Sequence, residues 1–154
     1  MRITSRIPEL PVERVRRVLD GLPPATGFEV VVKPLRYRDR PHLAAMTDFE
    51  ARTIVLQVPE PFFPFGEIVP YAAKRRPGRA MRFIWLTEGV TFRTPREVLR
   101  FLYLHEWMHW YLERHHGWGT SAETTCDRFA LRNYRRRKVT MTDAHAAMRR
   151  NGVG

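Results

Sequence analysis

Five consecutive residues, His105-Glu106-Trp107-Met108-His109, have the types and spacing of a metal centre. Residues four apart on a helix lie one turn apart on the same face, so both imidazoles can reach a single zinc ion. Glu106 is rotated by about 100° from His105 and can accept a proton from metal-bound water without binding the metal itself. A lone histidine is more often a hydrogen-bonded core residue, but two at this spacing favour a metal. We therefore expect one catalytic zinc ion on His105 and His109, with Glu106 as general base.

Two histidines leave a third protein ligand to be found, and three residues are candidates. His115 would point about 240° away from His109 around a continuous helix, and His116 would lie roughly 10 Å further along its axis. Either would serve only if the helix broke early. Glu123 follows two glycines that allow the chain to reverse, which would bring a second helix back against the first. It also closes a capping box that begins at Thr120, so its carboxylate could serve the helix start instead.

The segment from 105 to 130 resembles the gluzincin type of zinc metallopeptidase, in which H-E-x-x-H is followed on the next helix by E-x-x-x-D. The resemblance implies that Glu123 is the third zinc ligand and that Asp127 orients His105 and fixes its tautomer. It also implies hydrolysis of peptide bonds by zinc-activated water. The alternative for Asp127 is a surface ion pair with a neighbouring arginine.

The net charge gives a separate indication of partners. Lys and Arg total 27 against 16 Asp and Glu, a formal charge of +11. A positive field attracts nucleic-acid phosphates and acidic proteins, although such charges can simply keep a surface solvated. The densest run is Arg135-Arg136-Arg137-Lys138. We expect a protein or peptide substrate, with nucleic acid as a candidate second partner through the basic surface.

Two other functions are compatible with the sequence. His116-Gly117 resembles the His-Gly that follows the metal helix in the SprT-like group, at a shorter spacing, and this resemblance implies a DNA-associated protease. The other function is that of a non-catalytic zincin-fold regulatory or nucleic-acid-binding protein. A purely structural zinc site is disfavoured, because such sites are usually closed and rich in cysteine, and Cys126 is the one cysteine of the chain.

The elements that position these residues follow from periodicity and breaker residues. A threonine, a proline and a glutamate at 94–97 predict the capped start of a helix that runs to His115 or His116. A second helix is expected to begin at 120 or 121 and to end near 137. The other expected elements are a helix over 10–20, strands over 28–32, 43–46, 52–58 and 81–86, and a long structured loop over the proline-rich residues 59–80.

These elements predict an α+β fold with a single domain over 1–139 and a C-terminal tail or short helix over 140–154. The resemblance specifies a minimal zincin catalytic domain, in which a small twisted sheet with mostly antiparallel edges packs on a backing helix, the metal helix and the glutamate helix. We expect a strand edge at 81–86 or 52–58 to hold an extended peptide.

Two further expectations concern the reaction and its location. A second oxyanion donor would come from Tyr111, Tyr134 or His145, and the sequence does not choose among them. The N-terminus lacks the apolar segment of a signal peptide, and no apolar run approaches the roughly 18 residues of a spanning helix. We therefore expect a cytoplasmic protein with no membrane partner.

Overall fold

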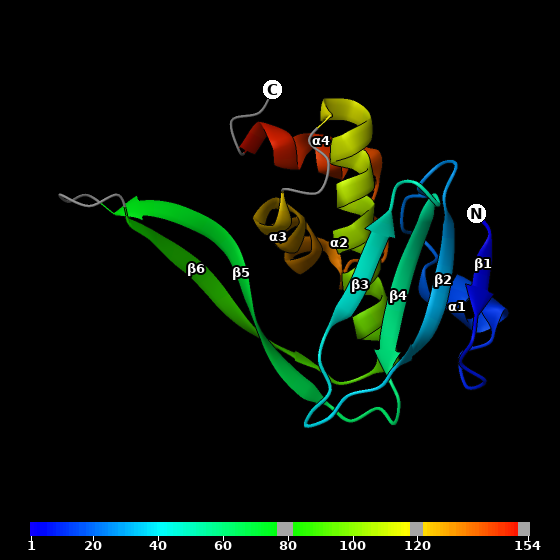
Figure 1. The fold of residues 1–154 in the computed structure, drawn as a ribbon. Coiled ribbons are helices and arrows are strands. Elements are labelled where there is room, and N and C mark those ends of the chain that lie inside the picture. The colour runs from blue at the N-terminus through cyan, green and yellow to red at the C-terminus, as the bar shows by residue number, and fades with distance from the viewer. Residues whose placement is uncertain (77–81, 118–121, 151–154) are drawn as a thin grey trace.

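The structure is a computed structural model that describes residues 1–76, 82–117 and 122–150, with the backbone alone at 75, 76, 82, 83 and 150. It has an α+β fold, as predicted (Figure 1). The elements in chain order are β1 (Ile3–Ser5), α1 (Val12–Val18), β2 (Glu29–Leu35), β3 (Ala44–Asp48), β4 (Thr53–Pro59), β5 (Phe65–Arg76), β6 (Arg82–Phe92), α2 (Pro95–His116), α3 (Glu123–Asn133) and α4 (Met141–Arg150).

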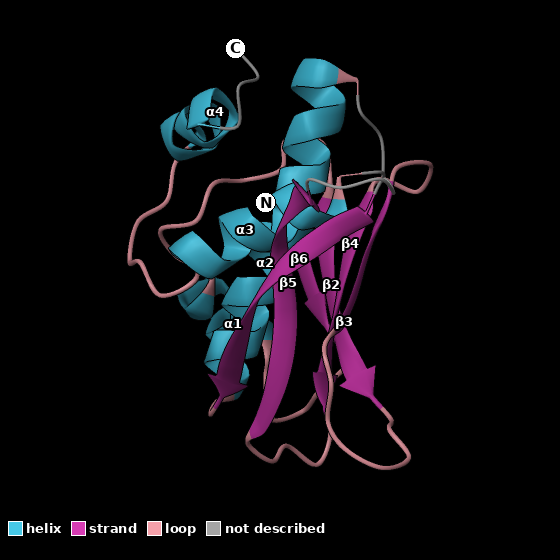
Figure 2. Ribbon diagram, turned by 90° about the vertical axis from the view of Figure 1, so that its left-hand side faces the viewer, coloured by secondary structure: helices cyan, strands magenta, loops and turns pink. Residues whose placement is uncertain are grey.

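A four-stranded sheet with the order β1-β2-β4-β3 forms one layer of the fold, and the helices form the other (Figure 2). Strand β2 is parallel to both β1 and β4, whereas β3 is antiparallel to β4. The prediction of mostly antiparallel edges therefore holds for β3 and is wrong for β1. Alternate residues of β4 are buried, as one covered face requires: Ile54, Leu56 and Val58.

Helix α2 forms the centre of the core, and its predicted boundaries are confirmed. The Thr94 hydroxyl accepts a hydrogen bond from the backbone N–H of Glu97, and Pro95 occupies the first turn. Gly117 ends the helix with a φ of 65°, in the left-handed region that favours glycine. Every residue from Val98 to Leu112 is buried. The segment His105 to His109 therefore lies on the buried part of the helix.

Strands β5 and β6 form a separate two-stranded antiparallel sheet that projects from the body (Figure 1). The predicted loop over 59–80 is therefore wrong for residues 65–76. Pro70 is tolerated within β5 because the pairing register shifts between Pro70 and Ala72, and a bulge or a free edge needs no N–H donor at proline. The predicted strand at 81–86 is observed from Arg82 and continues to Phe92; Met81 lies outside the described residues.

Arg100 of α2 holds the segment that follows α3 in place through hydrogen bonds. Its guanidinium is almost fully buried, at 3% exposure, and donates hydrogen bonds to the backbone carbonyl oxygens of Val18, Tyr134 and Arg136. These bonds hold the carbonyl groups of Tyr134 and Arg136 against α2, where the chain after Asn133 forms a turn instead of further helix. Helix α3 therefore ends at Asn133, and the predicted end near 137 is wrong.

The C-terminal segment is helical over 141–150, one of the two forms expected for 140–154. Ala144, Ala147 and Met148 of α4 are buried in the main core. No helix in the described part of the chain combines the length and the apolar character needed to cross a membrane.

Candidate metal centre

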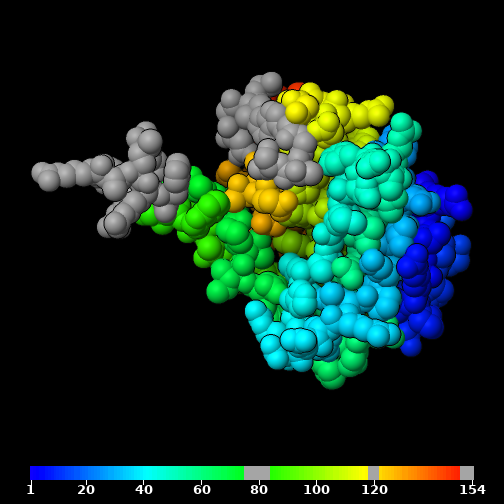
Figure 3. All heavy atoms as spheres, in the orientation of Figure 1, coloured from blue at the N-terminus to red at the C-terminus, as the bar shows by residue number. Residues whose placement is uncertain are grey.

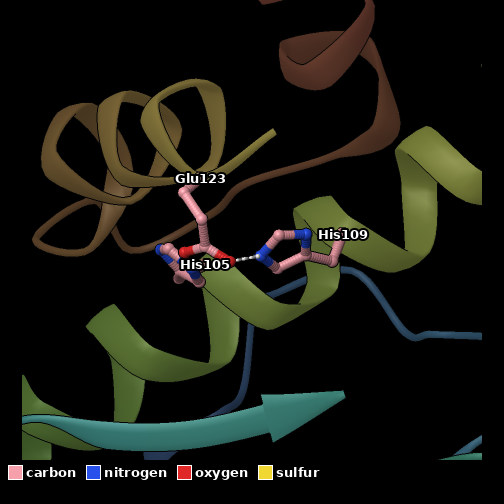
Figure 4. A group of neighbouring side chains, drawn as sticks. All are labelled: His105, His109 and Glu123. Carbon is pink, nitrogen blue, oxygen red and sulfur yellow. Dashed lines mark hydrogen bonds and ion pairs between the residues drawn. The ribbon is translucent and has the colours of Figure 1, made fainter. Parts of the chain in front are cut away.

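Helices α2 and α3 bring three potential ligands together (Figure 4). The Nε2 atoms of His105 and His109 lie 3.2 Å apart. Glu123, the first residue of α3, places one carboxylate oxygen 3.0 Å from His105 Nε2 and the other 2.9 Å from His109 Nε2. The two histidines are buried and Glu123 is exposed. The predicted ligand set therefore converges on one point at the protein surface.

The donor set fits zinc. In tetrahedral coordination with zinc–nitrogen distances of 2.0–2.1 Å, neighbouring ligand atoms are about 3.3 Å apart, close to the separations observed here. His109 Nδ1 is buried without a hydrogen-bond partner among the described residues, so its Nε2 is the nitrogen with partners nearby. Two neutral imidazoles and one carboxylate would leave an open position on the metal, as catalytic sites require.

The two histidines at the end of α2 do not join this group. The helix continues without a break to His116, so the early break that His115 or His116 needs does not occur. The ring of His115 instead lies 4.6 Å from the ring of Tyr111. Of the three candidate third ligands, Glu123 is the one that the fold brings to His105 and His109.

Asp127 lies one turn after Glu123 and contacts the other nitrogen of His105. Its Oδ1 atom is 2.8 Å from His105 Nδ1, so the predicted pairing with His105 is present. Burial lowers the pKa of His105, but hydrogen bonds to Asp127 and Glu123 outweigh burial and raise it to about 10. These contacts favour the imidazolium form of His105 when no metal is bound. Its Nε2 must lose a proton before it can bind a metal.

His109 and Glu123 have the opposite tendencies. Burial and the positive charge of His105 lower the pKa of His109, which favours the neutral ring. The hydrogen bond with His105 lowers the pKa of Glu123, which favours the carboxylate. Both shifts therefore favour the protonation state that metal binding needs.

Glu106 is next to the ligands but is held by another element. Its carboxylate is buried at 6% residue exposure, and its Oε2 atom is 3.6 Å from His105 Nε2. The hydroxyl of Thr47, on β3, lies 3.0 Å from Glu106 Oε1 and 3.2 Å from the Glu106 backbone oxygen. Burial raises the pKa of Glu106, because it disfavours the charged form. The contact with Thr47 fixes the position of the carboxylate, and the raised pKa increases its affinity for a proton; both suit a proton acceptor.

A cavity of about 340 Å³ opens at these residues. Strand β3, with the residue before it, forms one wall of the cavity, and α2 forms the other. Two residues of α3 complete the lining. The lining residues are Leu43, Ala44, Ala45, Met46, Thr47, Phe101, Leu102, His105, Glu106, His109, Glu123 and Asp127. The strand edge that lines the cavity is therefore β3, and the predicted edge at 52–58 is wrong. Residues 53–58 lie in β4, which is paired on both sides, and residues 82–86 lie in the projecting β5–β6 sheet.

Thr47 is the site residue that sequence reasoning missed. A threonine in an amphipathic strand carries no signal for such a role, because its partner Glu106 is 59 residues away. The three candidate oxyanion donors are not among the described residues that line the cavity. Tyr111 stacks on Trp107, Tyr134 packs against Phe101, and His145 is exposed on α4.

Comparisons with known proteins add no assignment: no protein-family model matches the chain, nor does any curated protein or solved structure. The chemistry of the site is therefore inferred from its own geometry.

Proposed function

We propose that the chain is a zinc metallopeptidase of the gluzincin type. The observation that carries the proposal is the convergence of His105, His109 and Glu123 beside a buried acid, Glu106, that a separate strand holds in place. The resemblance of residues 105–130 to that family agrees with this arrangement. His105, His109 and Glu123 would hold the ion, which when bound acts as a Lewis acid on a water molecule and on the substrate carbonyl.

Glu106 would supply the acid–base step of this hydrolysis. Its carboxylate accepts a proton from the attacking water and returns it to the leaving amine. A raised pKa brings its proton affinity nearer to the operating pH, where a group can both accept and release a proton. The hydroxyl of Thr47 engages one carboxylate oxygen and leaves the other, Oε2, on the side of His105.

Strand β3 would hold the substrate. It is the end strand of the sheet order, and it borders the cavity from Ala44 to Thr47. An edge strand offers unpaired backbone N–H and C=O groups, to which an extended peptide can add as a further strand. A peptide bound there lies along the wall that faces His105 and Glu106. The substrate class that fits is therefore an extended segment of polypeptide.

The substitution Glu106→Gln tests the proposal, with Glu113→Gln, an exposed site on the same helix, as matched control. Glu106→Gln should keep about one equivalent of zinc and lower the hydrolysis of a quenched peptide library about 100- to 10,000-fold, because the general base is lost. Glu113→Gln should change neither. Hydrolysis that survives Glu106→Gln at the wild-type rate would exclude this role, and a wild-type protein that binds zinc but cleaves no peptide would favour the non-catalytic alternative.

A further inference from the structure

The β5–β6 sheet is anchored to the body through its inner end, which is called its base here. Buried side chains hold that base in the core, namely those of Phe65, Val69, Val90 and Phe92. Further out, Ile84 is 47% exposed and Trp85 is 55% exposed. Figure 3 shows this part of the chain extending away from the rest of the molecule. Two large apolar side chains are thus presented to solvent on this arm.

The charges of this arm are separated along its length. The acidic residues lie towards the base, where Glu67 pairs with Val90 and Glu88 with Val69. The last paired positions are Lys74 opposite Ile84, Arg75 opposite Phe83, and Arg76 opposite Arg82. The outer end of β5 is therefore a run of three basic residues.

The outer part of β6 has a different character. It contributes Phe83, Ile84 and Trp85 at consecutive positions, so a basic strand runs beside an aromatic and aliphatic one. A run of cationic residues beside an exposed aromatic ring, here that of Trp85, is the combination that binds unpaired nucleic acid: the cations follow the phosphates while bases stack on the ring. From this juxtaposition we infer that the outer part of the β5–β6 arm binds single-stranded nucleic acid.

The same composition fits an anionic membrane less well. Successive residues of a strand point to opposite faces, so the exposed Ile84 and Trp85 do not form one apolar face that could lie in a bilayer surface. The outermost described pair, Arg76 with Arg82, is fully basic. A single-stranded nucleic acid is flexible, so its phosphates and bases can contact side chains on both faces of the arm.

The basic run is tested on the full-length protein with a fluorescein-labelled 15-nucleotide oligo(dT), by anisotropy across a salt series. The triple variant K74Q/R75Q/R76Q should bind more weakly, and its plot of log affinity against log salt should be shallower by about 2, because three phosphate contacts are lost. The matched control R17Q/R38Q/R149Q removes the same charge from exposed positions on the body and should keep the wild-type slope. Equal losses in the two triple variants would attribute binding to diffuse charge and overturn the inference.

The aromatic strand is tested in the same assay with Trp85. Trp85→Ala should weaken binding between about 5- and 100-fold, and Trp85→Phe should restore most of it, because any aromatic face can stack on a base. Binding that is indifferent to Trp85→Ala, a duplex of the same length bound as tightly as the single strand, or preferential binding to phosphatidylserine vesicles or to oligo-glutamate would each overturn the inference. None of these measurements involves Glu106 or zinc, so they succeed or fail independently of the proposed peptidase activity.

Discussion

The contact between Asp127 and His105 gives the most quantitative prediction for the metal centre. Asp127 Oδ1 lies 2.8 Å from His105 Nδ1, and the aspartate side chain is 18% exposed, so the hydrogen bond is largely shielded from water. With the metal on Nε2, the Nδ1–H group donates to this carboxylate. A partner of this kind fixes the tautomer and orientation of the ring and makes its other nitrogen a better ligand.

The expected magnitude follows from the type of bond. A hydrogen bond to a charged group contributes about 1.5–3 kcal/mol. That range corresponds to about 10- to 150-fold in affinity, which overlaps the 10- to 100-fold effect typical for partners of metal-binding histidines. Asp127→Ala removes both the acceptor and its charge and should weaken zinc binding by that amount. Asp127→Asn keeps an acceptor oxygen and should cause a smaller loss.

Competition with a fluorescent zinc chelator measures the affinities, and circular dichroism checks that each variant is folded. Asp39→Asn is the matched control, because it removes one negative charge from an exposed residue outside the cavity. Zinc affinity should fall in the order wild type, Asp127→Asn, Asp127→Ala, with Asp39→Asn equal to wild type. The reasoning is refuted if Asp127→Ala binds zinc as tightly as wild type, or if the control loses as much.

Three further predictions concern Glu106, His105 and the core. Thr47→Val should lower kcat for peptide hydrolysis about 10-fold or more while zinc stays bound, because it removes a hydrogen bond to the charged Glu106 carboxylate. Thr47→Ser keeps the hydroxyl and should hydrolyse peptides at the wild-type rate. If Thr47→Val is as fast as wild type, Thr47 does not position Glu106. His105 has its pKa raised to about 10, above an unfolded value of about 6.5, so its contribution to the stability of the zinc-free protein is complete below about pH 6.5 and is lost as pH rises through about 10. The melting temperature of chelator-treated wild type should therefore fall more steeply over that interval than that of His105→Gln. Arg100→Met should lower the free energy of unfolding in urea by at least about 3 kcal/mol, because it leaves several buried carbonyl oxygens without donors; an unchanged midpoint would contradict this.

Features that depend on a few neighbouring residues could be predicted from the sequence. The cap of α2 at Thr94 and its end at Gly117 are local signals, and so is the spacing of His105 and His109. The pairing of residues 43–46 with β4 is also short in sequence and is observed as the β3–β4 hairpin. The approach of Glu123 to His105 and His109 depends on a reversal of chain direction after α2, which the two glycines in this part of the sequence permit.

Features that depend on distant contacts could not be predicted in this way. The five prolines of residues 59–80 suggested a loop, because a proline costs a strand its donor unless a bulge or free edge removes the need. Strand β1 is three residues long and is defined by its pairing with β2, not by any periodicity of its own. The turn that follows α3 depends on hydrogen bonds from Arg100, which lies 34 residues before Tyr134.

His105, His109 and Glu123 are proposed to hold one zinc ion. Zinc content, measured by mass spectrometry on protein purified with the metal and then desalted, tests this proposal most directly in wild type, Glu123→Ala, His115→Ala and His116→Ala. Wild type, His115→Ala and His116→Ala should each retain about one equivalent, and Glu123→Ala should lose most of its zinc. Full zinc in Glu123→Ala, together with loss in His115→Ala or His116→Ala, would contradict the proposal.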